Sequence, residues 1–285
     1  MITVAGQRVP RHGFWIGAIW VVLTAISVPL IVYVVGPHLP PGRMTSEASD
    51  QTDANTVLTA LLVPLFLLVV VVIAYSLVVF RQRGAAIEDG PPLRGHAPTQ
   101  TTWLFLTSAI VIALAVWGSY TLVQTARGAG GGQGPSPTDL PKGDAPRLPI
   151  QVIGQQWEWT FRYPSYGAFE TRQLALPVNQ IVEFHVTSLD ITHSFWAFGL
   201  GVKADAVPGV DNVAFVRAKR TGSFTVRCAE LCGLWHGHMY RTGYVMSRSD
   251  FDAWVAKERA ADAANVKDLG PYSRTYSPDP FHRAG

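Results

Sequence analysis

The chain has 285 residues, of which 48% are hydrophobic and only 15% charged, a composition too apolar for an ordinary soluble protein. The formal net charge of +3 is small, and there is no block of Lys and Arg long enough to suggest nucleic-acid binding. Two cysteines four positions apart, Cys228 and Cys232, cannot build a disulfide framework. Because the composition is so apolar, membrane-spanning segments are the first feature to look for.

Three apolar runs in the first half of the chain predict transmembrane helices. They cover about residues 14–35, 57–80 and 103–123, and each approaches or exceeds the roughly 20 residues that cross a bilayer as a helix. None contains a charged residue, so buried helices of a soluble protein are a poor alternative. Pro64 lies inside the second run and predicts a kink. The first run could also be a cleaved signal peptide, but its length favours a retained span.

The arginines predict the orientation of these spans. Two precede the first run and three follow the second, whereas the loop between them has one Arg against three carboxylates. Because Lys and Arg favour the cytoplasmic side, the N-terminus and the second loop are expected inside and everything after about residue 125 outside. We therefore expect a multi-pass protein of a bacterial plasma membrane with its outer domain on the periplasmic face.

After the last run, the sequence changes character. The chain is expected to divide into a membrane anchor, a Gly/Pro-rich linker, a β-domain and an irregular tail, at residues 1–125, 126–145, 146–262 and 263–285. Apolar and polar residues alternate in the third part, as at Val182, Phe184 and Val186, which predicts short strands of a β-sandwich or barrel. A short helix is expected to begin near Ser249.

One short segment, residues 228–239, concentrates side chains that bind metals. Within twelve residues it offers two thiols, two imidazoles, a thioether and a carboxylate. Thiolate, imidazole and thioether together favour copper. Cys228 and Cys232 are too close in sequence to serve separate sites, and with both thiolates bridging, the loop can hold two ions. A disulfide would suit an oxidising compartment, but it would explain neither His236 nor Met239.

Three motifs carry a resemblance to a known family. The run Cys228-x-Glu230-x-Cys232-Gly233-x-x-His236-x-x-Met239 resembles the dinuclear copper (CuA) motif of cytochrome c oxidase subunit II. The segment 190–196 resembles the family segment with another histidine ligand, and residues 201–209 match its continuation. Gln156-Trp157-x-Trp159 resembles the aromatic cluster of the family near the place where electrons arrive. The resemblance covers about residues 55–255 and implies a cupredoxin-like β-sandwich anchored by transmembrane helices.

The resemblance also implies a role for individual residues. The thiolates would bridge two coppers, with one imidazole for each and two weak axial ligands. These copper ligands would be His193, Cys228, the backbone carbonyl of Glu230, Cys232, His236 and Met239. The Glu230 side chain would help to bind a magnesium ion at the interface with the catalytic subunit. Electrons from cytochrome c would arrive through Trp157. His185 and His238 do not fit the spacing and are expected to be surface or strand histidines.

The implied function is that of a terminal oxidase subunit that accepts electrons from cytochrome c at CuA and passes them to haem in the catalytic subunit I, where oxygen is reduced to water and protons are translocated. No residue of the oxygen-reducing site is expected here, and haem is expected only in the partner chain. Other oxidase subunits and the lipid bilayer are further expected partners, and nucleic acid is not. The alternatives are the small subunit of a CuA-containing nitric oxide reductase and a copper-binding assembly protein, with a quinol oxidase subunit a weaker third.

Some features depart from the family pattern. The first span is additional and moves the N-terminus inside. Gln100 stands where the family often has a glutamate near the mouth of a proton path, which puts a proton-uptake role in question. Glu158 stands where an aromatic is common, so the onward route for electrons is expected to be altered. From residue 125 onward there are 17 Lys and Arg against 15 Asp and Glu, which suits a less basic cytochrome than the family usually binds.

Overall fold

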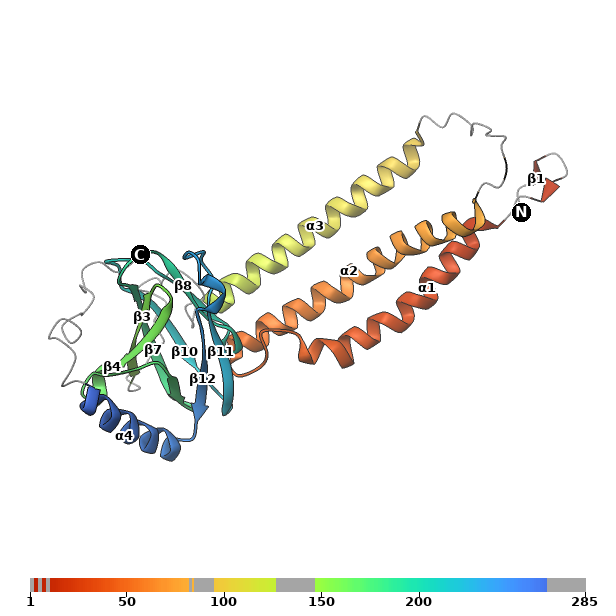
Figure 1. Ribbon diagram of the computed structural model, residues 1–285. Coiled ribbons are helices and arrows are strands. Elements are labelled where there is room, and N and C mark those ends of the chain that lie inside the picture. The colour runs from red at the N-terminus through yellow and green to blue at the C-terminus, as the bar shows by residue number, and fades with distance from the viewer. Residues whose placement is uncertain are drawn as a thin grey trace. The chain divides into compact units, whose positions relative to one another are not determined.

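The computed structural model describes residues 3–4, 7–8, 11–81, 84, 95–126 and 147–265. These residues fall into two compact units, one of residues 1–39 and 53–114 and the other of residues 40–52 and 115–285. Figure 1 labels the helices α1–α4 and several of the strands. The predicted fold class, three N-terminal apolar helices followed by a cupredoxin-like β-sandwich, is confirmed.

Three long helices make up the membrane-anchor part of the chain (Figure 1). They are α1 (His12–Leu30), which continues through the short turns η1 (Ile31–Val35) and η2 (Gly36–His38), α2 (Ser46–Val79) and α3 (Ala97–Ala126). Each is long and apolar enough to cross a membrane. Before them, two short strands pair with each other, β1 (Thr3–Val4) and β2 (Gln7–Arg8).

Two polar contacts join α1 to α2. His12 Nδ1 lies 2.9 Å from the hydroxyl of Tyr75, and the Trp20 indole donates a hydrogen bond of 2.8 Å to the carbonyl of Pro64. The contacts join the start of α1 to the end of α2, so the two helices run antiparallel. Side-chain hydrogen bonds of this kind help to hold apolar helices together in lipid. The helix α2 continues through Pro64, and the kink expected there stays a prediction.

The helix α2 begins at Ser46, earlier than the apolar run near residue 57 that predicted it. Thr45 caps it, because its hydroxyl accepts a hydrogen bond of 2.9 Å from the amide of Ala48. The same hydroxyl donates to the carbonyl of Leu200 in the β-domain at 2.9 Å. Residues 40–52 thus belong with the β-domain, and this packing extends the helix into a polar stretch that reads as a loop.

The β-domain consists of two five-stranded sheets with the strand orders β10-β7-β3-β4-β5 and β6-β12-β11-β8-β9. Its elements, in chain order, are β3 (Arg147–Gln155), β4 (Glu158–Tyr163), η3 (Pro164–Tyr166), β5 (Phe169–Thr171), β6 (Leu174–Pro177), β7 (Ile181–Ser188), β8 (His193–Ala197), η4 (Phe198–Leu200), β9 (Val202–Ala206), β10 (Asn212–Arg217), β11 (Gly222–Cys228), η5 (His236–His238), β12 (Tyr240–Met246) and α4 (Arg248–Asn265). Most pairings are antiparallel, but β3 pairs with β7 and β12 with β6 in parallel.

The core lies between the two sheets. Strands from both sheets, such as β3 and β9, alternate buried and less buried residues, which is the pattern of a half-buried strand. Phe161 and Phe184 of one sheet and Phe195 of the other are fully buried, and the ring centroids of Phe184 and Phe195 are 5.2 Å apart. The helix α4 packs against β5 and β6 and follows the end of β12 that lies away from the segment 228–239.

Some expectations fall outside the described residues. These are the linker 127–145, the tail beyond residue 265 and most of the loop between α2 and α3. The helix α4 begins one residue before the expected start at Ser249 and reaches Asn265, three residues into the expected tail. Gln100 lies in the first turn of α3 and is exposed.

Candidate metal centre

The segment 228–239 and the start of β8 form the site. Cys228 is the last residue of β11, and the chain then turns through residues 229–235 and η5 before β12 begins at Tyr240. Strand β8, which starts at His193, pairs antiparallel with β11, and Cys228 lies opposite Phe195. Neighbouring strands therefore bring the end of one to the beginning of the other, and His193 comes to lie beside Cys228 although 35 residues separate them.

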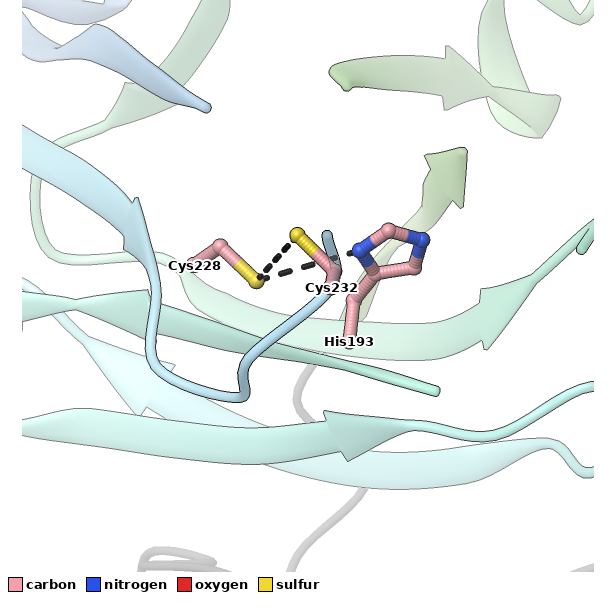
Figure 2. A group of neighbouring side chains, drawn as sticks. All are labelled: His193, Cys228 and Cys232. Carbon is pink, nitrogen blue, oxygen red and sulfur yellow. Dashed lines mark hydrogen bonds between the residues drawn. The ribbon is translucent and has the colours of Figure 1, made fainter. Parts of the chain in front are cut away.

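Three buried side chains converge at this point (Figure 2). The two thiols of Cys228 and Cys232 are 3.7 Å apart, and Nδ1 of His193 is 3.8 Å from the Cys228 sulfur. One donor atom from each of the three lies within 4.8 Å of the others, close enough to share a metal ion. Both cysteines are free.

The other predicted ligands lie around the same thiols. Nδ1 of His236 is 3.4 Å from the sulfur of Cys232, and the sulfur of Met239 is 3.7 Å from it. The backbone carbonyl of Glu230 is 3.1 Å from the sulfur of Cys228. Each thiol thus has one imidazole and one weak donor beside it. The side chain of Glu230 is exposed, so it points away from the buried donors that surround its carbonyl.

Asp190 fixes the orientation of one imidazole. Nε2 of His193 donates a hydrogen bond of 2.9 Å to its carboxylate, which leaves Nδ1 as the free lone pair facing Cys228. The backbone amides of Gln156 and Ile191 also donate to this carboxylate, at 2.6 and 2.7 Å. Partial burial alone would raise the pKa of Asp190, but these hydrogen bonds outweigh it and lower the pKa below its ordinary value.

The thiol of Cys232 is held in its neutral form when the protein is metal-free. The pKa of Cys232 is raised to about 12, mainly by burial and to a smaller extent by the neighbouring Cys228. At neutral pH, a metal that binds here must displace the thiol proton, because the thiolate is the ligand. Soft cations such as copper do so readily. Two thiols, two imidazoles, a thioether and a carbonyl in one dry cluster fit a pair of copper ions.

Trp157 lies against the metal loop. Its indole Nε1 donates a hydrogen bond of 2.9 Å to the carbonyl of Cys232, and the side-chain amide of Gln156 donates to the same carbonyl at 3.0 Å. Gly233 has a φ of 107°, a conformation that favours glycine, and a Cβ there would lie 3.4 Å from the indole nitrogen of Trp157. The turn between β3 and β4 is therefore packed directly on the loop between two predicted ligands.

Two features of the site lie beyond the roles assigned from sequence. Asp190 stands three positions before His193, and only its place in the same motif could have indicated its hydrogen bond to the His193 ring. Glu158 forms an ion pair with Arg241 of β12 and lies 3.8 Å from Nε of Arg172. These partners are distant in sequence, and no local pattern indicates the pairing.

The two other histidines of residues 147–265 lie elsewhere. His185, in β7, contacts the carboxylate of Asp211 at 2.9 Å. His238 is exposed, and its ring lies edge-on to that of Trp235 with centroids 5.3 Å apart. Neither belongs to the group around the two thiols.

Apolar helices, a cupredoxin-like sandwich and a buried cluster of one His and two Cys define a membrane-anchored protein with a soft-metal site. The family model described as cytochrome c oxidase subunit II, periplasmic domain, matches residues 169–242. Cytochrome c oxidase subunit 2 of Thermostichus vulcanus is 29% identical, over 87% of this chain and 88% of that protein. The protein of the same name from Alkalihalophilus pseudofirmus is 30% identical, over 70% of this chain and 56% of the relative.

Among solved structures, the periplasmic domain of subunit II of cytochrome oxidase from Bradyrhizobium japonicum is 33% identical, with a TM-score of 0.40, over 43% of this chain and 98% of that domain. Along most of its length the chain is similar to cytochrome c oxidase subunit II, and residues 169–242 match the periplasmic domain of that family. This family implies a CuA centre, and the group of His193, Cys228 and Cys232 is where the structure provides for a metal.

Proposed function

We propose that this subunit accepts electrons from cytochrome c at a dinuclear copper centre and passes them to haem in the catalytic subunit, where oxygen is reduced to water. The convergence of four further donors on one pair of buried thiols supports the proposal most strongly. The curated relatives are named cytochrome c oxidase subunit 2, which favours oxygen over nitric oxide as the final acceptor.

The residues that would hold the copper pair are His193, Cys228, the carbonyl of Glu230, Cys232, His236 and Met239. When bound, a thiolate-bridged copper pair supplies one-electron transfer with little change in its ligand geometry. The chain contributes a dry, prearranged cluster, since Cys232, His193 and Met239 are almost completely buried. A prearranged ligand set whose centre is shielded from water needs little rearrangement when its charge changes.

Trp157 is proposed as the residue through which electrons arrive. Its indole is only partly buried, so one edge can face a docked protein while the other is hydrogen-bonded to the carbonyl of Cys232. This single contact links the surface of the domain to the backbone of a copper ligand. Simple core packing is the alternative, since Trp157 also packs against the hydrophobic core; the choice of a predicted copper ligand's carbonyl as its hydrogen-bond partner favours the transfer role.

Glu230 is proposed to serve two partners. Its carbonyl points to Cys228, and its exposed carboxylate is free to reach a magnesium ion at the surface of the catalytic subunit. The arrangement follows from its position in the loop, where the backbone faces the thiols and the side chain faces out. We further propose that residues 146–262 form the copper-binding domain and lie outside the plasma membrane, with the N-terminus in the cytoplasm.

The test is electron paramagnetic resonance of the purified oxidase complex and of its Cys228→Ser variant. The wild type should give the pattern of one unpaired electron shared by two coppers. The variant lacks a bridging thiolate and should bind one copper or none, with a simple pattern or no signal. A shared-spin pattern that survives Cys228→Ser would show that the bridging assignment is wrong, and the proposed function with it.

A further inference from the structure

One histidine of the metal loop has no part in the proposed copper centre. His238 follows the predicted ligand His236 by two positions and directly precedes the predicted ligand Met239. Its side chain is exposed, and among the described residues its ring contacts that of Trp235 and forms no hydrogen bond or ion pair. An imidazole that can bind a metal therefore stands in solvent directly beside a metal site.

The predicted ligands become more buried from this histidine inward. His193, Cys232 and Met239 are almost completely buried, whereas His236 is only partly buried. A copper ion that arrives from solvent therefore meets the imidazole of His236 before it meets these three donors. His238 belongs to the same short turn, η5, and lies one step further out. The two imidazoles form a sequence of donors that leads from solvent to the thiols.

The turn that carries both imidazoles is well ordered by its own hydrogen bonds. The amide of His236 donates to the carbonyl of Gly233 at 3.1 Å, and the amide of His238 donates to the carbonyl of Trp235 at 2.9 Å. The ring of His238 lies edge-on to the indole of Trp235, with centroids 5.3 Å apart. A ring whose backbone is fixed and whose rotation is limited by a neighbour loses little conformational entropy when it binds a metal.

An exposed imidazole suits the first contact with a copper ion. Imidazole is a good copper ligand, and in its neutral form it binds without releasing a proton. At the surface it can replace one water molecule of the hydrated ion while the others remain. Copper that passed straight from water to the buried donors would instead have to lose its hydration before any new bond held it.

We propose that His238 captures copper ions at the surface and passes them through His236 to the buried thiols, so that it serves the loading of the centre and is not a ligand of the loaded centre. The proposal rests on the proposed function of that centre. In the transfer, the bond from copper to the His238 nitrogen breaks, bonds from copper to the inner donors form, and the thiol protons go to water. One Cu⁺ and one Cu²⁺ supply the charge of a pair that shares one unpaired electron, so the step needs no oxidant or reductant.

The test follows copper uptake by the full-length, copper-free chain purified in detergent. The chain is mixed rapidly with equal amounts of Cu⁺ and Cu²⁺, and the growth of the thiolate–copper absorbance gives the loading rate. For the wild type we expect a rate that levels off as the copper concentration rises, because the capture site fills. His238→Gln should load roughly tenfold more slowly at low copper, where capture raises the local copper concentration most, with a rate that stays proportional to concentration.

The loaded state provides a second measurement, because both proteins should end with two coppers and the same shared-spin resonance. His185→Gln is the matched control, since it replaces the same residue type in β7, away from the thiols, and should load at the wild-type rate.

Equal loading rates for the wild type and His238→Gln at every copper concentration would overturn the capture role. Fewer than two coppers in fully loaded His238→Gln would also overturn it, because His238 would then belong to the loaded centre. A wild-type chain that takes up no coupled copper pair would instead mean that the proposed function has failed.

Discussion

Replacing the predicted ligand Met239 distinguishes its effect on the reduction potential of the copper centre from its effect on copper binding. Its sulfur lies 3.7 Å from that of Cys232, and it is almost fully buried. Leu is close to Met in volume, so Met239→Leu should cost less than about 1.5 kcal/mol of folding free energy. Because an axial thioether adjusts a copper site more than it holds it, we expect two coppers to remain and the reduction potential to rise. Redox titration of the copper signal measures this, and loss of copper from the variant would contradict it.

A single residue can also report on pH. Burial raises the pKa of Glu170 above its ordinary value of 4.5, Arg162 opposes the rise and Asp262 adds to it. A carboxyl whose pKa is raised in the folded state is most favourable in its protonated form. Its contribution to stability is fully present below the unfolded pKa and is lost as the pH rises through the folded pKa.

We therefore expect Asp262→Asn to stabilise the protein by a few tenths of a kcal/mol near pH 7, because it removes a like charge from Glu170. The benefit should disappear as the pH falls and Glu170 becomes protonated, because the neutral carboxyl no longer repels the neighbouring charge. Chemical denaturation of the two proteins from pH 4 to pH 7 measures the difference. Asp252→Asn, an exposed position on the same helix whose partner is Arg248, serves as the control and should show no such gain. A difference that grows toward acid would contradict the argument.

Among the structural elements, the pair Glu158–Arg241 joins β4 to β12 and thus links the two sheets beside the metal loop. Removing one partner leaves the other charge partly buried, which costs more than removing both. A double-mutant cycle with Glu158→Gln and Arg241→Gln should give a coupling energy of about 0.5–3 kcal/mol. Thermal unfolding supplies the four stabilities, and strictly additive effects would show that the pair does not hold the sheets together.

The predicted and observed elements agree best where the signal is local. The donors of the metal centre lie mostly within one segment, 228–239, so their types and spacing were sufficient to predict the cluster. The Glu158–Arg241 pair joins residues 83 positions apart, and no spacing rule reaches that far. The early start of α2 was missed for a related reason. The polar stretch at its start is helical because Thr45 and its neighbours pack on the β-domain, whose residues lie more than 100 positions further along the sequence.

For the whole chain, the arrangement of arginines predicts which side of the membrane each end occupies. Single cysteines at His96, just before α3, and at Thr221, an exposed turn before β11, test it in intact cells with an impermeant thiol reagent. The native cysteines are buried and should give little background. We expect Thr221→Cys to be labelled and His96→Cys to be protected until the cells are opened. Ready labelling of His96→Cys in intact cells would overturn the proposed topology.

The packing of residues 40–52 on the β-domain determines the order in which the protein can be completed during synthesis. The ribosome makes Met44 and Thr45 long before their partners, since the backbone amide of Lys219 bonds to the carbonyl of Met44 at 2.8 Å and Thr45 reaches across 155 positions to Leu200. The early segment must therefore wait without these partners while two further apolar helices and most of the β-domain are translated. Contacts of such long sequence separation form late and slowly. The contacts of Met44 and Thr45 therefore cannot all form until Lys219 has been translated. A chain interrupted before Lys219 would leave Met44 without this partner in the β-domain.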